Sequence, residues 1–261
     1  KDGRYNGGHE NTYLLDNIDV YWKEHGNRRY STRAILVDTS PDWVPGYQNS
    51  DMTRLFKPDN FIFGGSGCDY NFAKGFYTEG FELMDEVMDT IRKEVENTDF
   101  AQGIKMVHSL GGGTGSGLGT LLVSRIRDDY PDITVCTYSI CPYISVTSSV
   151  VEPYNAVFAL HELLDNADQT FIIQNEACFN ICRNILKQKK PKHADLNWII
   201  SLTMADVTAL WRYPTQLNRD FRRLGINLIP FPRLHFLTIG HAPFFKPKHG
   251  ININISKDEL E

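Results

Sequence analysis

Hydrophobic and polar residues along the chain follow two alternating patterns. Short apolar runs predict β-strands at 33–38, 60–64, 104–110, 133–140 and 169–173. Apolar residues that recur every three or four positions predict helices at 78–97, 118–130, 152–167, 175–187 and 195–213. Strands that alternate with helices indicate an α/β fold with a doubly wound, mostly parallel sheet, in which ligands bind at the carboxyl ends of the strands.

Two of the predicted helices have distinctive apolar patterns. In 78–97 the apolar residues predicted to face the core are Phe81, Met84, Val87, Met88, Ile91 and Val95. The segment 195–213 is apolar on most sides, which predicts a helix buried on several faces.

The order of elements changes near Trp211. The segments that follow are helical at 215–224, strand-like at 230–244 and alternating, as in a strand, at 251–255. We therefore predict an α/β domain at 1–192, a connecting helix at 193–212 and the start of a second, α+β domain at 213–261.

Both ends of the sequence carry information about the chain. The first residues are polar and include no initiator Met, so we expect the chain to start inside a longer product. Ser256 and Glu259 have the spacing of a capping box, which predicts that a helix begins where the sequence stops. We expect either a fragment or a short second domain that needs a partner surface.

Composition argues against several classes of protein. The net charge of −5 disfavours nucleic acid as a partner. No apolar run reaches the roughly 18 residues of a membrane span, so no membrane partner is predicted. Five cysteines without a CxxC motif fit a reducing compartment, and Cys178 and Cys182 are interpreted as buried thiols. The basic run at 186–193 is interpreted as a solvated loop.

The strongest chemical signal is a glycine-rich segment between a predicted strand and a predicted helix. Five of the seven residues from Gly111 to Gly117 are glycine. Backbone N–H groups at the start of such a helix, with the hydroxyls of Thr114 and Ser116, suit a phosphate group. The segment has no Walker A lysine, and its glycines lack the GxGxxG spacing. On these grounds alone, a phosphate-binding loop and a tight turn both stay open.

The string GGGTGSG resembles the signature of the tubulin family, and the resemblance covers essentially the whole chain. LFKPDNFIFGGSG, AKGFYTEG, VVEPYNA, NEACFNIC, DLNWIISLTMADVT and PFPRLHF occur in the order and spacing of a β-type tubulin chain. Arg223 stands where β-type chains carry a base, whereas α-type chains carry a glutamate that helps to hydrolyse the GTP of the neighbouring subunit.

The resemblance implies a fold, a location and partners. It implies a GTP-binding α/β domain joined through a long helix to a second domain, in subunits that stack head to tail in microtubules. It implies a cytoplasmic, cytoskeletal protein, with the ciliary axoneme as one such place. It also implies that this chain is truncated at both ends, because the first strand, the first helix and the later domain of the family are not in the sequence.

The resemblance further implies which residues contact the nucleotide, GTP or GDP. The implied phosphate contacts are Ser109, Gly112, Gly113, Thr114, Gly115, Ser116 and Asn71. Glu152 stands at a ribose position, and Asn175, His193 and Asn197 stand at guanine positions. No catalytic residue and no metal ligand is predicted.

Several positions depart from the family pattern. Ser40 replaces the metal-side glutamate, Ser148 the ribose-side aspartate and His193 the tyrosine that stacks on guanine. In the loop GCDYNF a family glycine is Asp69 and a phosphate-contacting asparagine is Tyr70. A carboxylate about 4 Å from a phosphate charge costs on the order of 4 kcal/mol at an effective dielectric near 20, so Asp69 is expected to disfavour a triphosphate. The change at Ser40 argues against a strong Mg²⁺ site.

Two functions from different classes are consistent with these features. One is a structural component of microtubules that binds tubulin subunits or the lattice, binds guanine nucleotide, and hydrolyses GTP weakly or not at all. The other is a fully competent polymerising GTPase subunit of which this chain is a fragment. The altered phosphate loops favour the first, and the dense match to the family favours the second. Hydrolysis by the chain alone is predicted to be negligible.

Overall fold

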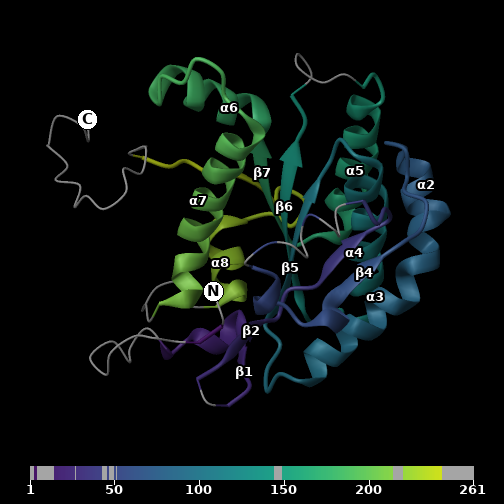
Figure 1. Ribbon diagram of the computed structural model, residues 1–261, viewed down its shortest axis with the longest axis vertical. Coiled ribbons are helices and arrows are strands. Elements are labelled where there is room, and N and C mark those ends of the chain that lie inside the picture. Colours follow the sequence, from purple (N-terminus) through teal and green to yellow (C-terminus); the bar gives the residue numbers. More distant parts are fainter. Residues whose placement is uncertain are drawn as a thin grey trace, which may run out of the picture.

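The computed structural model of this 261-residue chain describes residues 3–4, 15–26, 28–42, 46, 50, 52–143, 149–213 and 220–242. The five strands predicted between residues 33 and 173 are all present in it. The strands are β3 (Leu36–Asp38), β4 (Phe61–Phe63), β5 (Gly103–Ser109), β6 (Thr134–Cys141) and β7 (Gln169–Gln174). All of them pair in parallel, β3 with β4 and β5 with β6 and then β7, which confirms the α/β fold class (Figure 1).

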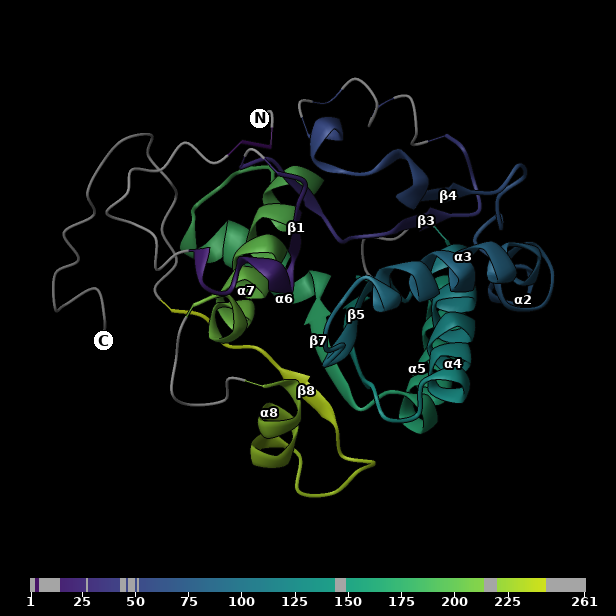
Figure 2. The ribbon, with the colours of Figure 1, turned by 90° about the horizontal axis from the view of Figure 1, so that it is seen from below.

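Helices cover both faces of the sheet that contains β5, β6 and β7. On one face lie α3 (Glu79–Glu96), α4 (Gly119–Asp129) and α5 (Glu152–Asn166), and on the other lie α6 (Asn175–Asn180), α7 (His193–Arg212) and α8 (Phe221–Leu228) (Figures 1 and 2). Strand β6 contributes to both layers, because successive side chains point to opposite faces. Val135 packs with the first group of helices, whereas Cys136 and Tyr138 pack with the second.

Some elements were not predicted from the sequence. These are the antiparallel hairpin of β1 (Trp22–Glu24) and β2 (Tyr30–Thr32), helix α2 (Phe72–Tyr77), and 3-10 turns at Ile18–Val20, Thr53–Leu55 and Pro58–Asn60. Two further helical stretches have π geometry, Thr114–Leu118 before α4 and Ile181–Ile185 after α6.

The strand-like segment at 230–244 behaves differently from expectation. Within it, β8 (Phe236–Thr238) pairs in parallel with β7 and so extends the sheet of the first domain. The segment at 251–255 and the predicted helix onset at Ser256 lie outside the described residues. The division into domains at 1–192, 193–212 and 213–261 therefore stays a prediction.

The predicted core face of α3 is correct with one exception. Met84, Val87 and Ile91 are buried, but Phe81 is 55% exposed, so its assignment to the core was wrong. The reason is the neighbouring Gly80, which is buried where the start of α3 packs closely against α2, and which therefore occupies the inward-facing position.

The cysteine prediction is confirmed for the helix pair. Cys178 and Cys182 are both buried free thiols. In the part of the chain that the structure describes, no group of three or more His, Cys, Asp or Glu side chains is arranged to hold a metal ion. None of the described helices has the length and apolar character needed to cross a membrane.

Candidate functional site

Three loops meet at the carboxyl ends of β3, β4 and β5. Thr39, which follows β3, is completely buried, and its Oγ1 lies 2.6 Å from Oγ1 of Thr114 in the glycine-rich loop. The Thr114 hydroxyl donates to Oδ1 of Asp38 over 3.1 Å, and the thiol of Cys68, which follows β4, donates to Thr39 over 3.2 Å. A continuous chain of side-chain hydrogen bonds thus ties the three loops together.

Packing explains most glycines of the loop. A Cβ at Gly113 would lie 2.7 Å from Cβ of Cys68, and one at Gly115 would lie 2.4 Å from the carbonyl oxygen of Ser109. A Cβ at Gly117 would meet the carbonyl oxygen of Phe72 at 2.4 Å. Gly112 differs, because nothing lies within 4 Å of the position its Cβ would take. The loop therefore packs tightly on one side and leaves an open face at Gly112.

Asn155 of α5 joins the glycine loop to the loop after β4. Its side chain is buried and donates to the carbonyl oxygens of Gly111 (2.9 Å) and Tyr70 (2.7 Å). Its Oδ1 accepts from the backbone N–H of Phe72 over 3.2 Å. One amide thus fixes the relative position of two loops, a role that the sequence reasoning missed.

His108 supports the glycine loop from the sheet. Its Nδ1 lies 2.7 Å from the carbonyl oxygen of Gly115, so Nδ1 carries the proton, and Nε2 accepts from the Ser139 hydroxyl at 2.8 Å. Burial lowers the pKa of His108, which keeps the ring neutral. His108 was also missed from the sequence.

The predicted phosphate residues have different environments. Ser116 is fully buried and its hydroxyl donates to the carbonyl oxygen of Gly112, so it stabilises the loop from within. The Ser109 hydroxyl accepts from the N–H of Gly111 over 3.3 Å. Asn71 caps helix α2 by accepting from the backbone N–H of Ala73 over 2.9 Å.

The loop after β4 holds two residues in an unusual backbone conformation. Asp69 and Tyr70 have φ values of 47° and 56°, a region that glycine and asparagine adopt more readily. The carboxylate of Asp69 forms an ion pair of 2.5 Å with Lys74 of α2, and both side chains are exposed. The negative charge of Asp69 is thus partly neutralised by Lys74 of the helix that follows.

The predicted ribose and guanine residues lie on the elements that follow β6 and β7. Glu152 begins α5, and a Cβ at Gly111 would lie 3.2 Å from its Oε2, which places this carboxylate next to the glycine loop. Burial raises the pKa of Glu152. Asn175 begins α6 directly after β7. The assignment of Glu152 to the ribose and of Asn175 to the guanine stays a prediction.

His193 and Asn197 lie one turn apart at the start of α7, and both are exposed. The structure records no hydrogen bond, among the described residues, between their side chains and the glycine loop. Ser148 lies outside the described residues, so its place relative to the site is not defined.

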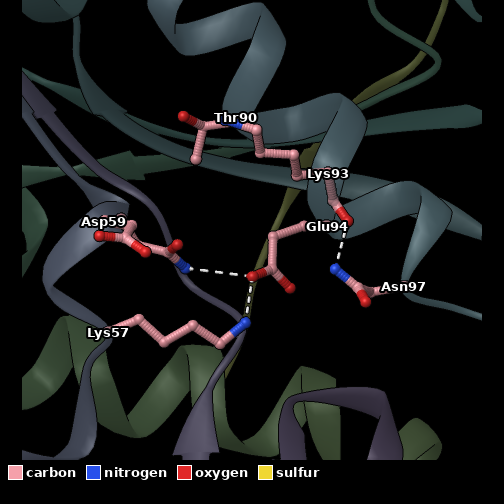
Figure 3. A pocket seen from close by; sticks show the side chains of 7 residues that line it. Lys57, Asp59, Thr90, Lys93, Glu94 and Asn97 are labelled. Carbon is pink, nitrogen blue, oxygen red and sulfur yellow. Dashed lines mark hydrogen bonds and ion pairs between the residues drawn. The ribbon is translucent and has the colours of Figure 1, made fainter.

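A cavity of about 310 Å³ lies away from these loops and contains none of the predicted site residues. It is bounded by the segment before β4 and by α3, and its lining residues are Lys57, Asp59, Asn60, Thr90, Lys93, Glu94 and Asn97 (Figure 3). Glu94 pairs with Lys57 at its centre. The cavity is therefore lined by a structural ion pair, and the glycine loop does not contribute to it.

The fold and the loops together define a class of protein. A glycine-rich loop that follows a parallel strand and leads into a helix, at the carboxyl edge of a doubly wound sheet, is the arrangement of nucleotide-binding α/β domains.

Comparison with known proteins identifies the family within that class. A family model described as "Tubulin/FtsZ family, GTPase domain" matches residues 6–183. The tubulin beta-1 chain of Geotrichum candidum is 52% identical over 233 residues, which cover 89% of this chain and 52% of that protein. The tubulin beta chain of Encephalitozoon cuniculi is 51% identical over 241 residues, which cover 92% of this chain and 54% of that protein. The tubulin beta-6 chain of Gossypium hirsutum is 50% identical over 241 residues, with the same coverage.

This chain therefore belongs to the tubulin/FtsZ family, and its similarity to β-type tubulin chains is confirmed. It spans about half the length of the curated relatives it matches.

Proposed function

We propose that this protein is a β-type tubulin subunit with a structural role in microtubules, and that it binds guanine nucleotide at the glycine-rich loop. Its partners are other tubulin subunits, in head-to-tail contact, and its place is the cytoplasmic microtubule cytoskeleton. The family match over residues 6–183 and the similarity to tubulin beta chains support this proposal.

The observation that carries the nucleotide part is the open face at Gly112. Packing alone requires glycine at positions 113, 115 and 117, whereas no neighbour within 4 Å requires it at Gly112. An uncovered glycine backbone at the start of a helix suits a phosphate group, since N–H groups there have no intrahelical partner. We assign phosphate contacts to the backbone of Gly112, Gly113 and Gly115 and to the hydroxyls of Ser109 and Thr114, with the Thr114 hydroxyl donating to phosphate in place of Asp38.

The remaining predicted residues complete the proposed site. Glu152, beside Gly111, is assigned to the ribose, and Asn175, His193 and Asn197 to the guanine. Ser116 and Asn71 act indirectly in this proposal, because their side chains hold the loop and cap α2.

We propose that the chain alone hydrolyses GTP negligibly. Ser40 supplies a hydroxyl, which donates to Asp42, at the position where the resemblance implies a metal-side carboxylate. Asp69 adds a negative charge beside the loop that would hold the terminal phosphate. Both features weaken triphosphate and Mg²⁺ binding relative to diphosphate binding. In this proposal the bound nucleotide lies at the junction between stacked subunits.

Chemical extraction of the purified protein tests the proposal. The protein is denatured, and the released nucleotide is identified by chromatography and quantified against protein. We expect GDP, or GDP with a minor share of GTP. Stoichiometric GTP with bound Mg²⁺ would favour the alternative, a fully competent GTPase subunit. Absence of nucleotide, together with no binding of added GDP, would contradict the nucleotide proposal and leave GGGTGSG with a packing role only.

A further inference from the structure

Helix α5 has two stripes of side chains, and the fold buries only one of them. The buried residues of its inward face are Asn155, Ala159 and Leu163. A second stripe, at the spacing i, i+3, i+4 and i+7, consists of Val157, Leu160, His161 and Leu164. A helix presents side chains to a neighbouring helix at this spacing. The second stripe thus has the pattern of a helix–helix contact, yet Val157 is 65% exposed.

The second stripe of α5 is one wall of a groove of about 580 Å³. The sheet supplies the floor of the groove, which consists of Cys141, Ile172, Gln174 and Phe236. Cys141 of β6 and Phe236 of β8 pack against the same core as α3 and α4, so the groove lies on that face of the sheet. Among the described residues, no helix follows α5 over β8 on this face (Figure 2).

Two hydrogen-bonding side chains of the groove are available to a partner. His161 of the α5 wall and Gln174 at the end of β7 are both exposed. Neither side chain forms a hydrogen bond within the described ranges of the chain. The groove is otherwise apolar, so these two groups are placed to fix the position of whatever fills it.

The elements around the groove carry charge of one sign. Helices α5 and α6 and strands β6, β7 and β8 contain no lysine or arginine, and their acidic residues are Glu152, Glu162, Asp165 and Glu176. Asp165 forms an ion pair of 3.3 Å with Arg233, which precedes β8. The other three carboxylates form no recorded ion pair with a described residue. A partner that complements this surface is therefore basic around an apolar face.

We propose that this groove binds a basic amphipathic helix from another protein. The apolar side chains of that helix pack between the α5 stripe and the floor, which is how helices dock in grooves. Its lysine or arginine side chains pair with the surrounding carboxylates. A second copy of this chain is disfavoured, because a two-fold contact through this surface would bring the same carboxylates together. The groove contains none of the residues assigned to the nucleotide, so the proposal does not rest on nucleotide binding.

Cys141 reports whether the groove is filled. The other four cysteines are buried, whereas Cys141 is half-buried on the groove floor. Burial raises the pKa of Cys141, so its alkylation by iodoacetamide is followed at a pH of about 8.5 or above. The probe is a synthetic peptide of about 14 residues, close to the length of α5, in which leucine recurs at helical spacing and all other positions are lysine. We expect the peptide to slow alkylation of Cys141 saturably, on the order of fivefold or more.

Two control peptides separate charge from shape. One has glutamate in place of every lysine, and the other alternates leucine and lysine so that its apolar face has the period of a strand. We expect neither to protect Cys141. No protection by the lysine helix, or equal protection by either control peptide, would overturn the proposal. Slower alkylation on raising the protein concentration without peptide would assign the groove to a second copy and would also overturn it.

A pair of variants places the peptide in the groove. Val157→Lys adds a cation to the exposed part of the α5 stripe, and lysine is a good helix former, so the fold is expected to persist. We expect this variant to raise the peptide concentration that gives half-protection on the order of tenfold. Val20→Lys changes an exposed valine outside the groove and should leave that concentration unaltered. Equal effects of the two substitutions would contradict binding at this groove.

Discussion

The hydroxyl oxygens of Thr39 and Thr114 lie 2.6 Å apart and connect two sheets that share no backbone ladder in the described residues. Thr39 follows β3, and Thr114 lies beyond β5, 75 residues later. Thr39 is also linked to the loop after β4, because its hydroxyl accepts from the thiol of Cys68. The candidate site is therefore assembled by side-chain hydrogen bonds between loops, and its geometry depends on a few buried polar residues.

Asn155 is the first of these residues to test. Asn155→Ala removes three hydrogen bonds and leaves the carbonyl oxygens of Gly111 and Tyr70 without their donor. We expect a loss of about 3 kcal/mol in the free energy of unfolding, since buried groups stay unsatisfied. Urea denaturation measures the change. Asn166→Ala, on the same helix, removes bonds to Glu162 only and serves as the control. Equal effects of the two substitutions would contradict the role assigned to Asn155.

Alanine substitutions at Gly112 and Gly113 distinguish a role in ligand binding from a role in packing. A Cβ at Gly113 would lie 2.7 Å from Cβ of Cys68 and 2.8 Å from the backbone nitrogen of Asn71, so Gly113→Ala is expected to cost about 3 kcal/mol of stability. Gly112→Ala meets no neighbour, and we expect its stability to stay within about 1 kcal/mol of the parent protein. Gly112→Ala should nevertheless weaken GDP binding at least tenfold. Unaltered GDP affinity of Gly112→Ala would show that phosphate does not approach this face.

The lowered pKa of Lys105 predicts that the stability of the protein depends on pH in the alkaline range. Burial lowers the pKa of Lys105 from an ordinary value near 10.5 to about 8 in the folded protein, so between these values the unfolded chain binds a proton that the folded chain lacks. Stability attributable to Lys105 therefore rises with pH across this window, by up to about 3 kcal/mol.

The measurement is the difference in unfolding free energy between the parent protein and Lys105→Met at pH 7 and pH 10. This difference cancels the titration of Cys136, whose pKa burial raises to about 12 and which is present in both proteins. We expect the parent protein to gain stability relative to Lys105→Met between pH 7 and pH 10. A difference that does not vary with pH would contradict the assigned pKa shift.

The ion pair in the cavity of Figure 3 has a structural role. The Glu94 side chain is 13% exposed, pairs with Lys57 and lies 4.0 Å from Arg33. Glu94→Gln leaves two half-buried cations without a counter-charge, and we expect a loss of about 2 kcal/mol. Thermal denaturation checks this value. Glu96→Gln on the same helix, which removes an exposed pair with Arg92, should leave the midpoint unchanged. A similar shift for both variants would argue against the special role of Glu94.

The parallel strands and the long helices were predictable because their apolar patterns are strong. Helix α2 was not, since it has six residues and a central glycine. The structure explains that glycine, because a Cβ at Gly75 would lie 2.3 Å from the carbonyl oxygen of Gly113. The hairpin of β1 and β2 was missed because most of its residues are polar and half-exposed. Short elements of this kind are fixed by tertiary contacts, which local sequence does not encode.

The glycine loop was predictable, but the residues that hold it were not. Asn155, His108 and Thr39 are buried polar residues whose partners lie far away in sequence. One signal was present for Asn155, which lies on the same helical face as the buried Ala159 and Leu163. A polar residue on an apolar stripe indicates a buried hydrogen bond, and reading α5 in this way would have found it.

The central claim is that the loop beside Asp69 still binds guanine nucleotide but disfavours the third phosphate. The most direct measurement is calorimetric titration of GDP, GTP with Mg²⁺, and ATP into the parent protein and into Asp69→Gly/Tyr70→Asn. We expect the parent protein to bind GDP more tightly than GTP and to show no binding of ATP. The double substitution removes a carboxylate and places residues suited to the positive φ values at both positions. It should strengthen GTP binding roughly tenfold more than GDP binding. Equal gains for the two nucleotides, tighter GTP than GDP binding by the parent protein, or no guanine binding at all would contradict the account.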